Sequence, residues 1–191
     1  MKKILIVGSL LFASTVSVAQ PAIREPIYAL SDSNRERIDA NRDYFLQILA
    51  IQDCLMAGQD ISVNHLQSLM PQNKDEFLTF AILEEYACEK KGNDVVMSEK
   101  NIFESVWKYA IADTLDMMER YVEWFNWCDG GIAEEVWTVG VSVEEKHPEK
   151  FQKLLRTIAP KWYPEWLVWR NTVYGQRSPH QGVKITFERL N

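Results

Sequence analysis

The spacing of apolar residues predicts a chain built from amphipathic helices. Apolar positions recur at steps of three and four through most of the chain, and Gly or Pro stands at the ends of the periodic segments. Ser33 and Glu36 form a capping box before the first segment. The predicted helices cover 34–57 (stopped by Gly58), 62–70, 73–91, 99–127, 132–146, 148–159 and 164–174. We therefore expect an all-α fold: an irregular helical bundle, or stacked antiparallel helix pairs, of about six to seven helices.

Two of these segments leave alternatives open. A straight helix over 99–127 would be about 43 Å long at 1.5 Å per residue, so we expect either a bend near 113–116 or a long central helix. Residues 132–146 have helical periodicity, but Val139–Val143 also alternates like a strand. We favour a helix there, because the charged ends and the preceding cap, Asp129, suit one; Gly140 would then allow a close helix contact. After Gly175, residues 183–187 suggest a short extended C-terminal arm.

The first residues have the features of an export signal. Lys2 and Lys3 precede an apolar stretch, and Ser17-Val18-Ala19 supplies the small residues of a signal-peptidase site. The stretch is short for a membrane anchor, and no later stretch of 18 apolar residues follows. We expect a cleavable signal peptide at 1–19, an extended lead-in at 20–33 and one helical domain at 34–191. The expected location is periplasmic or secreted, in a Gram-negative-type envelope, with no membrane span after cleavage.

Charge and cysteine content narrow the choice of partners. Loss of Lys2 and Lys3 leaves 19 basic against 27 acidic residues, a net charge near −8. An acidic chain without a basic cluster is not expected to bind nucleic acid. In an oxidising compartment Cys54 and Cys88 are the pair we would join by a disulfide, but we favour three reduced, buried thiols.

Aromatic and acidic residues form the only conspicuous clusters. All seven Trp lie after residue 106, and Trp162, Trp166 and Trp169 crowd one region. They are a possible binding surface for sugar rings or an apolar peptide, although core packing is the interpretation we favour. Acidic pairs occur at Glu84-Glu85, Glu134-Glu135 and Glu144-Glu145. Adjacent acids point about 100° apart on a helix and seldom converge. Asp113 and Asp116 share a face, and Asp116 is spaced for an ion pair with Arg120.

No recognisable catalytic, metal or cofactor motif occurs in the sequence. The three His are isolated, and neither a zinc-hydrolase motif, a nucleophile elbow nor a Gly-rich phosphate loop is present. We therefore expect a non-catalytic exported protein, with no cofactor, that binds an unidentified protein partner. An immunity or inhibitor protein is one such role. The alternative is a carbohydrate- or peptidoglycan-binding module, or a degenerate cell-wall hydrolase, that uses the Trp-rich region 160–170.

Overall fold

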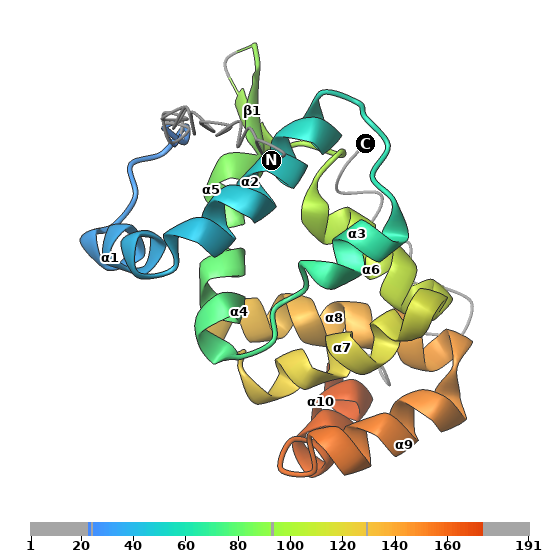
Figure 1. Ribbon diagram of the computed structural model, residues 1–191. Coiled ribbons are helices and arrows are strands. Elements are labelled where there is room, and N and C mark those ends of the chain that lie inside the picture. The colour runs from blue at the N-terminus through green and yellow to red at the C-terminus, as the bar shows by residue number, and fades with distance from the viewer. Residues whose placement is uncertain (1–22, 24, 93, 129, 174–191) are drawn as a thin grey trace, which may run out of the picture.

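The computed structural model describes residues 23, 25–92, 94–128 and 130–173, and within these ranges the fold is mostly helical (Figure 1). The predicted all-α class is confirmed. The helices are α1 (Asp32–Ala40), α2 (Arg42–Met56), α3 (Val63–Ser68), α4 (Lys74–Ala81), α5 (Leu83–Ala87), α6 (Ile102–Ala112), α7 (Met117–Glu123), α8 (Gly130–Lys146), α9 (Pro148–Ile158) and α10 (Tyr163–Val173), with 3₁₀ turns η1 (Thr114–Asp116) and η2 (Trp124–Asn126).

The predicted helix over 34–57 is two helices that meet at Asn41. The first begins two residues earlier than predicted, because the hydroxyl of Ser31, not Ser33, accepts a hydrogen bond from the Asn34 amide. Asn41 has φ −121°, outside the helical range, and its side-chain amide donates to the Arg37 carbonyl. Gly58, at φ +77°, follows the end of α2 as predicted, since a left-handed residue there suits glycine.

A β-hairpin interrupts the helices where the sequence analysis expected a helix and a loop. After α5 the chain forms β1 (Cys88–Lys91), which pairs antiparallel with β2 (Asp94–Met97) from Cys88↔Met97 to Lys91↔Asp94. The prediction of helix to residue 91 is therefore wrong. Gly92, at φ +67°, begins the tight connection, and Gly92-Asn93 is a hairpin signal that the helical periodicity outweighed.

The long segment 99–127 bends at 113–116, so the first of the two alternatives is confirmed. Asp113, Leu115 and Asp116 all have left-handed backbone angles, with φ between 52° and 58°. Such angles are costly for residues other than glycine. Contacts from elsewhere hold them: Gln67 donates to the Leu115 carbonyl, and Lys150 pairs with both aspartates. The cap of α6 is the buried Asn101, whose side chain accepts from the Glu104 amide.

Residues 132–146 lie in α8, so the favoured helix is confirmed and the strand alternative is wrong. The expected close contact at Gly140 is also present. A Cβ atom there would lie 3.1 Å from Phe125 and 3.1 Å from Trp166, both of which are fully buried. The absence of a side chain at Gly140 therefore lets two large rings pack directly on the helix backbone.

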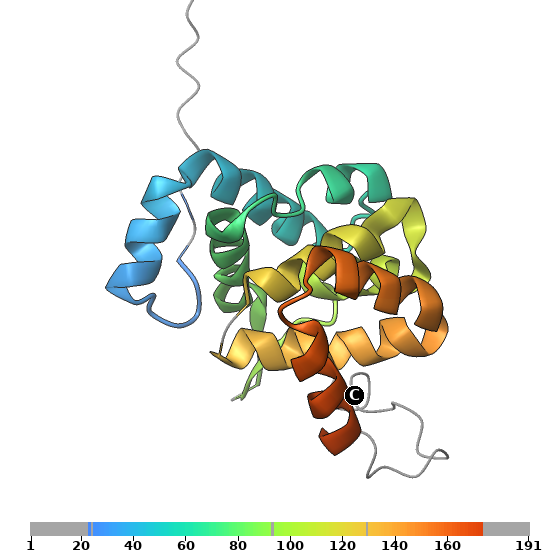
Figure 2. The ribbon, with the colours of Figure 1, turned by 90° about the horizontal axis from the view of Figure 1, so that it is seen from below.

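The helices form two groups that share one core. In the first, α2 packs against α4 and α5; in the second, α8 contacts α6 and α9, and α7 also contacts α9 (Figure 1). The helix α10 lies across α8 (Figure 2), where Trp137 of α8 meets Trp162, Trp166 and Trp169. A hydrogen bond from the Ile102 amide to the buried Gln52 side chain joins α6 to α2 across the groups.

Some of the predicted segments lie wholly or partly outside the described residues. The signal peptide at 1–19 and the extended arm at 183–187 lie outside them. The lead-in is described at residue 23 and from residue 25, and it has no helix before Asp32. None of the helices in the described ranges has both the length and the apolar character that crossing a membrane requires.

Candidate functional site

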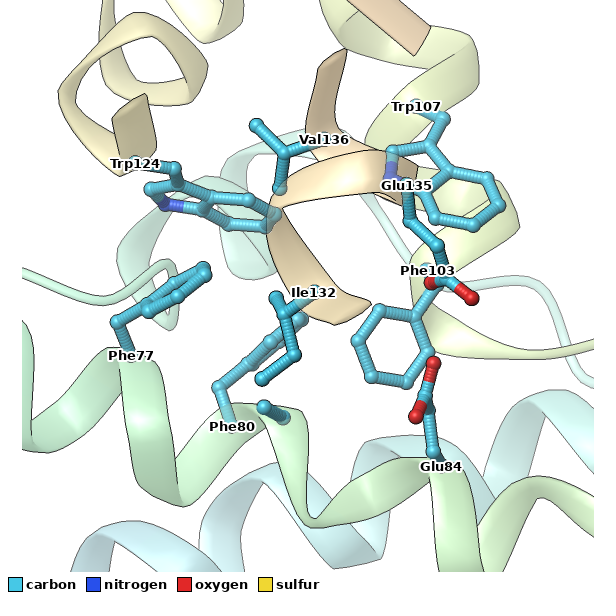
Figure 3. A pocket seen from close by; sticks show the side chains of 10 residues that line it. Phe77, Phe80, Glu84, Phe103, Trp107, Trp124, Ile132, Glu135 and Val136 are labelled. Carbon is cyan, nitrogen blue, oxygen red and sulfur yellow. The ribbon is translucent and has the colours of Figure 1, made fainter. Parts of the chain in front are cut away.

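A narrow pocket lies where the two groups of helices meet. Its walls come from α4 and α5 on one side and from α6, η2 and α8 on the other (Figure 3). Its cavity volume is about 20 Å³, which is room for about one water molecule. The lining residues are Phe77, Phe80, Ala81, Glu84, Phe103, Trp107, Trp124, Ile132, Glu135 and Val136. Eight of the ten are apolar, so the two glutamates stand out.

The pocket has an apolar inner end and an acidic mouth. Phe77, Phe80 and Trp124 are almost completely buried at the inner end. Glu135 is exposed and Glu84 is half-buried, and in Figure 3 their carboxyl groups point toward one another beside Phe103. The accessible part of the pocket is its acidic mouth, because the rings at the inner end pack against one another.

The two glutamates share a hydrogen bond, and their environment favours a bound proton. Burial, the charge of Glu135, the hydrogen bond to Glu135 and the charge of Glu85 raise the pKa of Glu84 to about 8. At neutral pH Glu84 is therefore protonated and donates to the Glu135 carboxylate. Burial is the largest of these causes, because removal of water penalises the charged form of the Glu84 carboxyl group.

No cation within the described ranges compensates these acids. Neither Glu84 nor Glu135 forms an ion pair with a lysine, arginine or histidine of the described residues. The nearby thiol of Cys88 donates to the Glu84 carbonyl at 3.5 Å. Burial and the charges of Glu85 and Glu84 raise the pKa of that thiol. The mouth of the pocket is thus locally negative, and no basic side chain of the described residues pairs with its two acids.

The arrangement suits binding of a cation better than hydrolysis of a sugar. Two carboxyl groups in direct hydrogen-bond contact are closer than the spacing of about 5 Å or more that glycosidases place across the scissile bond. A negatively charged mouth over aromatic walls instead favours a positively charged group, both by charge and by attraction to ring faces.

This site is not evident from adjacent residues in the sequence, because its two acids belong to different pairs. Glu84 belongs to one adjacent pair and Glu135 to another, and neither pair converges by itself. A usable signal was present: Glu84 continues the apolar stripe of Phe77 and Phe80, at steps of three and four. An acidic residue on the core-facing stripe of a helix indicates a partly buried charge.

The predicted binding surface Trp162, Trp166 and Trp169 lies in an aromatic cluster with Trp137. Trp166 is fully buried against Phe125 and Phe151, whereas Trp162 and Trp169 are half-buried. Trp166 and Trp169 stack at 5.7 Å, and the Lys161 ammonium lies 4.8 Å from the centre of the Trp162 ring. These rings bury much of their surface against one another, whereas Val168, next to Trp169 in the sequence, is 67% exposed.

The acidic face at the bend differs from the prediction in its partner. Asp113 and Asp116 share Lys150 of α9, at 2.6 Å and 3.7 Å. The predicted ion pair of Asp116 with Arg120 is not present; Arg120 pairs with Glu123 at 3.3 Å instead. The reason is the left-handed backbone of Asp116, which breaks the helical spacing that the prediction assumed.

Other candidate chemistry is also placed by the structure. No disulfide joins Cys54 to Cys88, since both are free thiols, and Cys128 is buried. No group of three His, Cys, Asp or Glu suited to holding a metal ion occurs within the described ranges.

Comparison of the chain with models of known protein families, with curated proteins and with solved structures finds no match.

Proposed function

We propose that this chain is an exported, non-catalytic protein that binds a partner protein through the mouth of the Glu84–Glu135 pocket. The observation that carries the proposal is the pair of carboxyl groups at the mouth of the pocket, with the exposed Glu135 at the surface and no cation of the described residues against either group. A site left negatively charged by its own chain favours a positively charged group on another molecule. The leader-like first 19 residues support export.

A sharper form of the proposal is an immunity or inhibitor protein. Such a protein would protect the envelope from a toxin that acts on the cell wall or membrane. The net charge of −6 for the full sequence is compatible with a basic target, because opposite charge speeds encounter. A toxin-like gene next to the gene for this chain would support that form, and protection of cells from the toxin would test it.

Affinity capture from an envelope fraction, followed by measurement of the dissociation constant with the purified partner, tests the proposal. Glu135→Lys places a positive charge at the mouth and should weaken binding about tenfold or more. Glu134→Lys is the matched control, since it makes the same change at the neighbouring exposed position of α8 and should alter binding only slightly. A partner that binds both variants equally well would contradict the assignment of this pocket as the contact site.

The second candidate is a carbohydrate- or peptidoglycan-binding module. The half-buried Trp162 and Trp169 beside the exposed Val168 favour it, because sugar rings stack on such aromatic surfaces. Tryptophan fluorescence during titration with peptidoglycan fragments separates the candidates. A shift in emission that Trp162→Ala abolishes would support the module, and an unchanged emission would remove it.

A further inference from the structure

The β-hairpin has a free edge along β2. A backbone hydrogen bond of 2.8 Å joins Ser98 to Ala87, and the paired register continues from Cys88↔Met97. Bonded and non-bonded pairs alternate along an antiparallel ladder, so the backbone N–H and C=O groups of Val95 and Met97 point away from β1. On that side neither residue forms a backbone hydrogen bond within the described ranges. The outer edge of β2 can therefore accept a further strand.

The two edges of the hairpin differ in polarity and charge. Three half-buried apolar side chains make up most of β2: Val95, Val96 and Met97. The exposed acids Asp94 and Glu99 flank them, and neither forms an ion pair within the described ranges. The strand β1 instead carries the exposed Lys90 and Lys91, and lysines are typical of edges that proteins protect from strand pairing. The edge of β2 thus favours an apolar strand that also carries positive charge.

One segment of the same chain has this chemistry. Residues 183–187, which lie outside the described ranges, read Val-Lys-Ile-Thr-Phe, so three apolar side chains alternate with Lys184 and Thr186. Residues 174–191 contain three basic residues and a single acid, Glu188, whereas the full sequence has a net charge of −6. The segment therefore matches the acid-flanked edge of β2 and would be repelled by the lysines of β1.

The connection to this segment is long enough to reach the hairpin. The hairpin extends beyond the helices from the end of α5, so its surroundings are open (Figure 1). Residues 174–182 follow α10, and at about 3.3 Å per residue they span up to about 30 Å. A domain of this size has a radius of gyration of roughly 15 Å, so the reach is comparable with its diameter.

We propose that residues 183–187 bind the outer edge of β2 of the same chain as a third strand. The alternating pattern places the three apolar side chains on one face of the sheet, beside the apolar residues of β2. A two-stranded hairpin alone is marginally stable, and a third strand gives it the size at which sheets become stable. The inference is independent of the proposed function, because the pocket between Glu84 and Glu135 takes no part in it.

Amide hydrogen exchange of the full chain, followed residue by residue by NMR, tests the proposal. The outward amides of Val95 and Met97 should be protected in the wild type. Ile185→Pro removes an N–H from the middle of the added strand and should speed exchange of both amides about tenfold or more. Gln181→Pro makes the same change just outside the segment and should leave both rates unchanged.

Three results would overturn the proposal. The first is exchange of the Val95 and Met97 amides in the wild type as fast as in an unfolded peptide. The second is protection that Ile185→Pro does not reduce, since another occupant would then cover the edge. The third is protection that disappears on dilution, because the added strand would then come from a second copy of the chain.

Discussion

Glu84 lies between two environments that act on its carboxyl group in the same direction. Aromatic walls remove water from one side, and the carboxylates of Glu135 and Glu85 add negative charge on the other. Both effects favour the protonated form, which then serves as the hydrogen-bond donor of the pair. The folded protein tolerates partial burial of this carboxyl group because the group is neutral there.

This environment predicts a stability that depends on pH. The folded-state pKa of Glu84, about 8, lies above its unfolded value near 4.5, so its contribution is complete below pH 4.5 and is lost as the pH rises to 8. Glu84→Gln keeps a donor without the titration, and should raise the free energy of unfolding at pH 8 by about 1 kcal/mol after allowance for solvent at the mouth.

Urea unfolding at pH 5, 7 and 8 measures this difference. Glu134→Gln, at an exposed position of α8, is the control and should follow the wild-type pH dependence. A Glu84→Gln variant that loses stability between pH 5 and 8 as steeply as the wild type would show that Glu84 does not carry the proton.

At the scale of single residues, the sequence indicates which side chains are candidates for a site but not which of them lie together in the fold. Trp166 was part of an aromatic crowd that could be core or surface, and its complete burial depends on Phe125 and Phe151. The Glu84–Glu135 pair joins residues about 50 positions apart, on α5 and α8. Periodicity describes one helix at a time, so it cannot say which helix faces share a pocket.

At the scale of elements, α8 packs closely against two aromatic rings at one residue, Gly140. Gly140 lets Phe125 and Trp166 approach to the distance at which a Cβ atom would touch both. The two rings also contact each other, at 5.7 Å between centres, so neither can move without disturbing the other. The helix tolerates a glycine in its interior because the packing gain exceeds its propensity cost of about 1 kcal/mol.

Gly140→Val should therefore destabilise the fold. The added methyl groups meet two fully buried rings, and overpacking of this kind costs about 1–3 kcal/mol. Thermal unfolding followed by circular dichroism measures the loss. Thr138→Val introduces the same side chain at a half-buried position of the same helix and should change stability by less than about 0.5 kcal/mol. A Gly140→Val protein as stable as the control would contradict the packing argument.

The type of secondary structure was predicted correctly where the local sequence signals agreed, and wrongly where two signals competed. Pro148 and the capping residues Ser62 and Asn73 mark helix starts that the structure retains. Near residue 90, helical periodicity competed with the hairpin signal of Gly92-Asn93 in the sequence, and β1 pairs with β2 in the structure. Asn41 breaks a continuous apolar pattern, and its side chain donates to the Arg37 carbonyl four residues earlier, a local capping contact that the spacing of apolar residues does not register.

On the scale of the whole molecule, the pocket exists only when both groups of helices are assembled. Its lining residues run from Phe77 to Val136 in the sequence. The hydrogen bond from the Ile102 amide to the Gln52 side chain is one contact that joins the two groups. The second group extends to α10 through an ion pair with one buried partner: Arg170 of α10, which is partly exposed, lies 2.6 Å from Glu144 of α8, which is 2% exposed and also accepts from Gln152. That pair holds the final described helix to the rest.

Arg170→Met should weaken the attachment of α10. It leaves the buried Glu144 carboxylate without its cation, and breaking such pairs is strongly destabilising, although the partial exposure of Arg170 reduces the effect to about 2 kcal/mol. Urea unfolding followed by tryptophan fluorescence measures it. The double variant Glu144→Met with Arg170→Met removes both charges and should recover part of the loss. A single variant as stable as the wild type would show that the pair contributes little.

The position of α10 has a consequence for the lifetime of the protein. This helix comes last in the described fold. Arg170 pairs with Glu144 of α8, Tyr163 accepts from Arg156 of α9, and Trp166 packs on Phe151 of α9 and on Trp137 of α8. Opening of α10 as a local unit, with the other helices still folded, requires these contacts to break together. Detachment would expose Trp166, Glu144 and a length of unprotected backbone to proteases. Turnover in the cell would then follow the opening equilibrium of this one helix, and not the global stability of the fold.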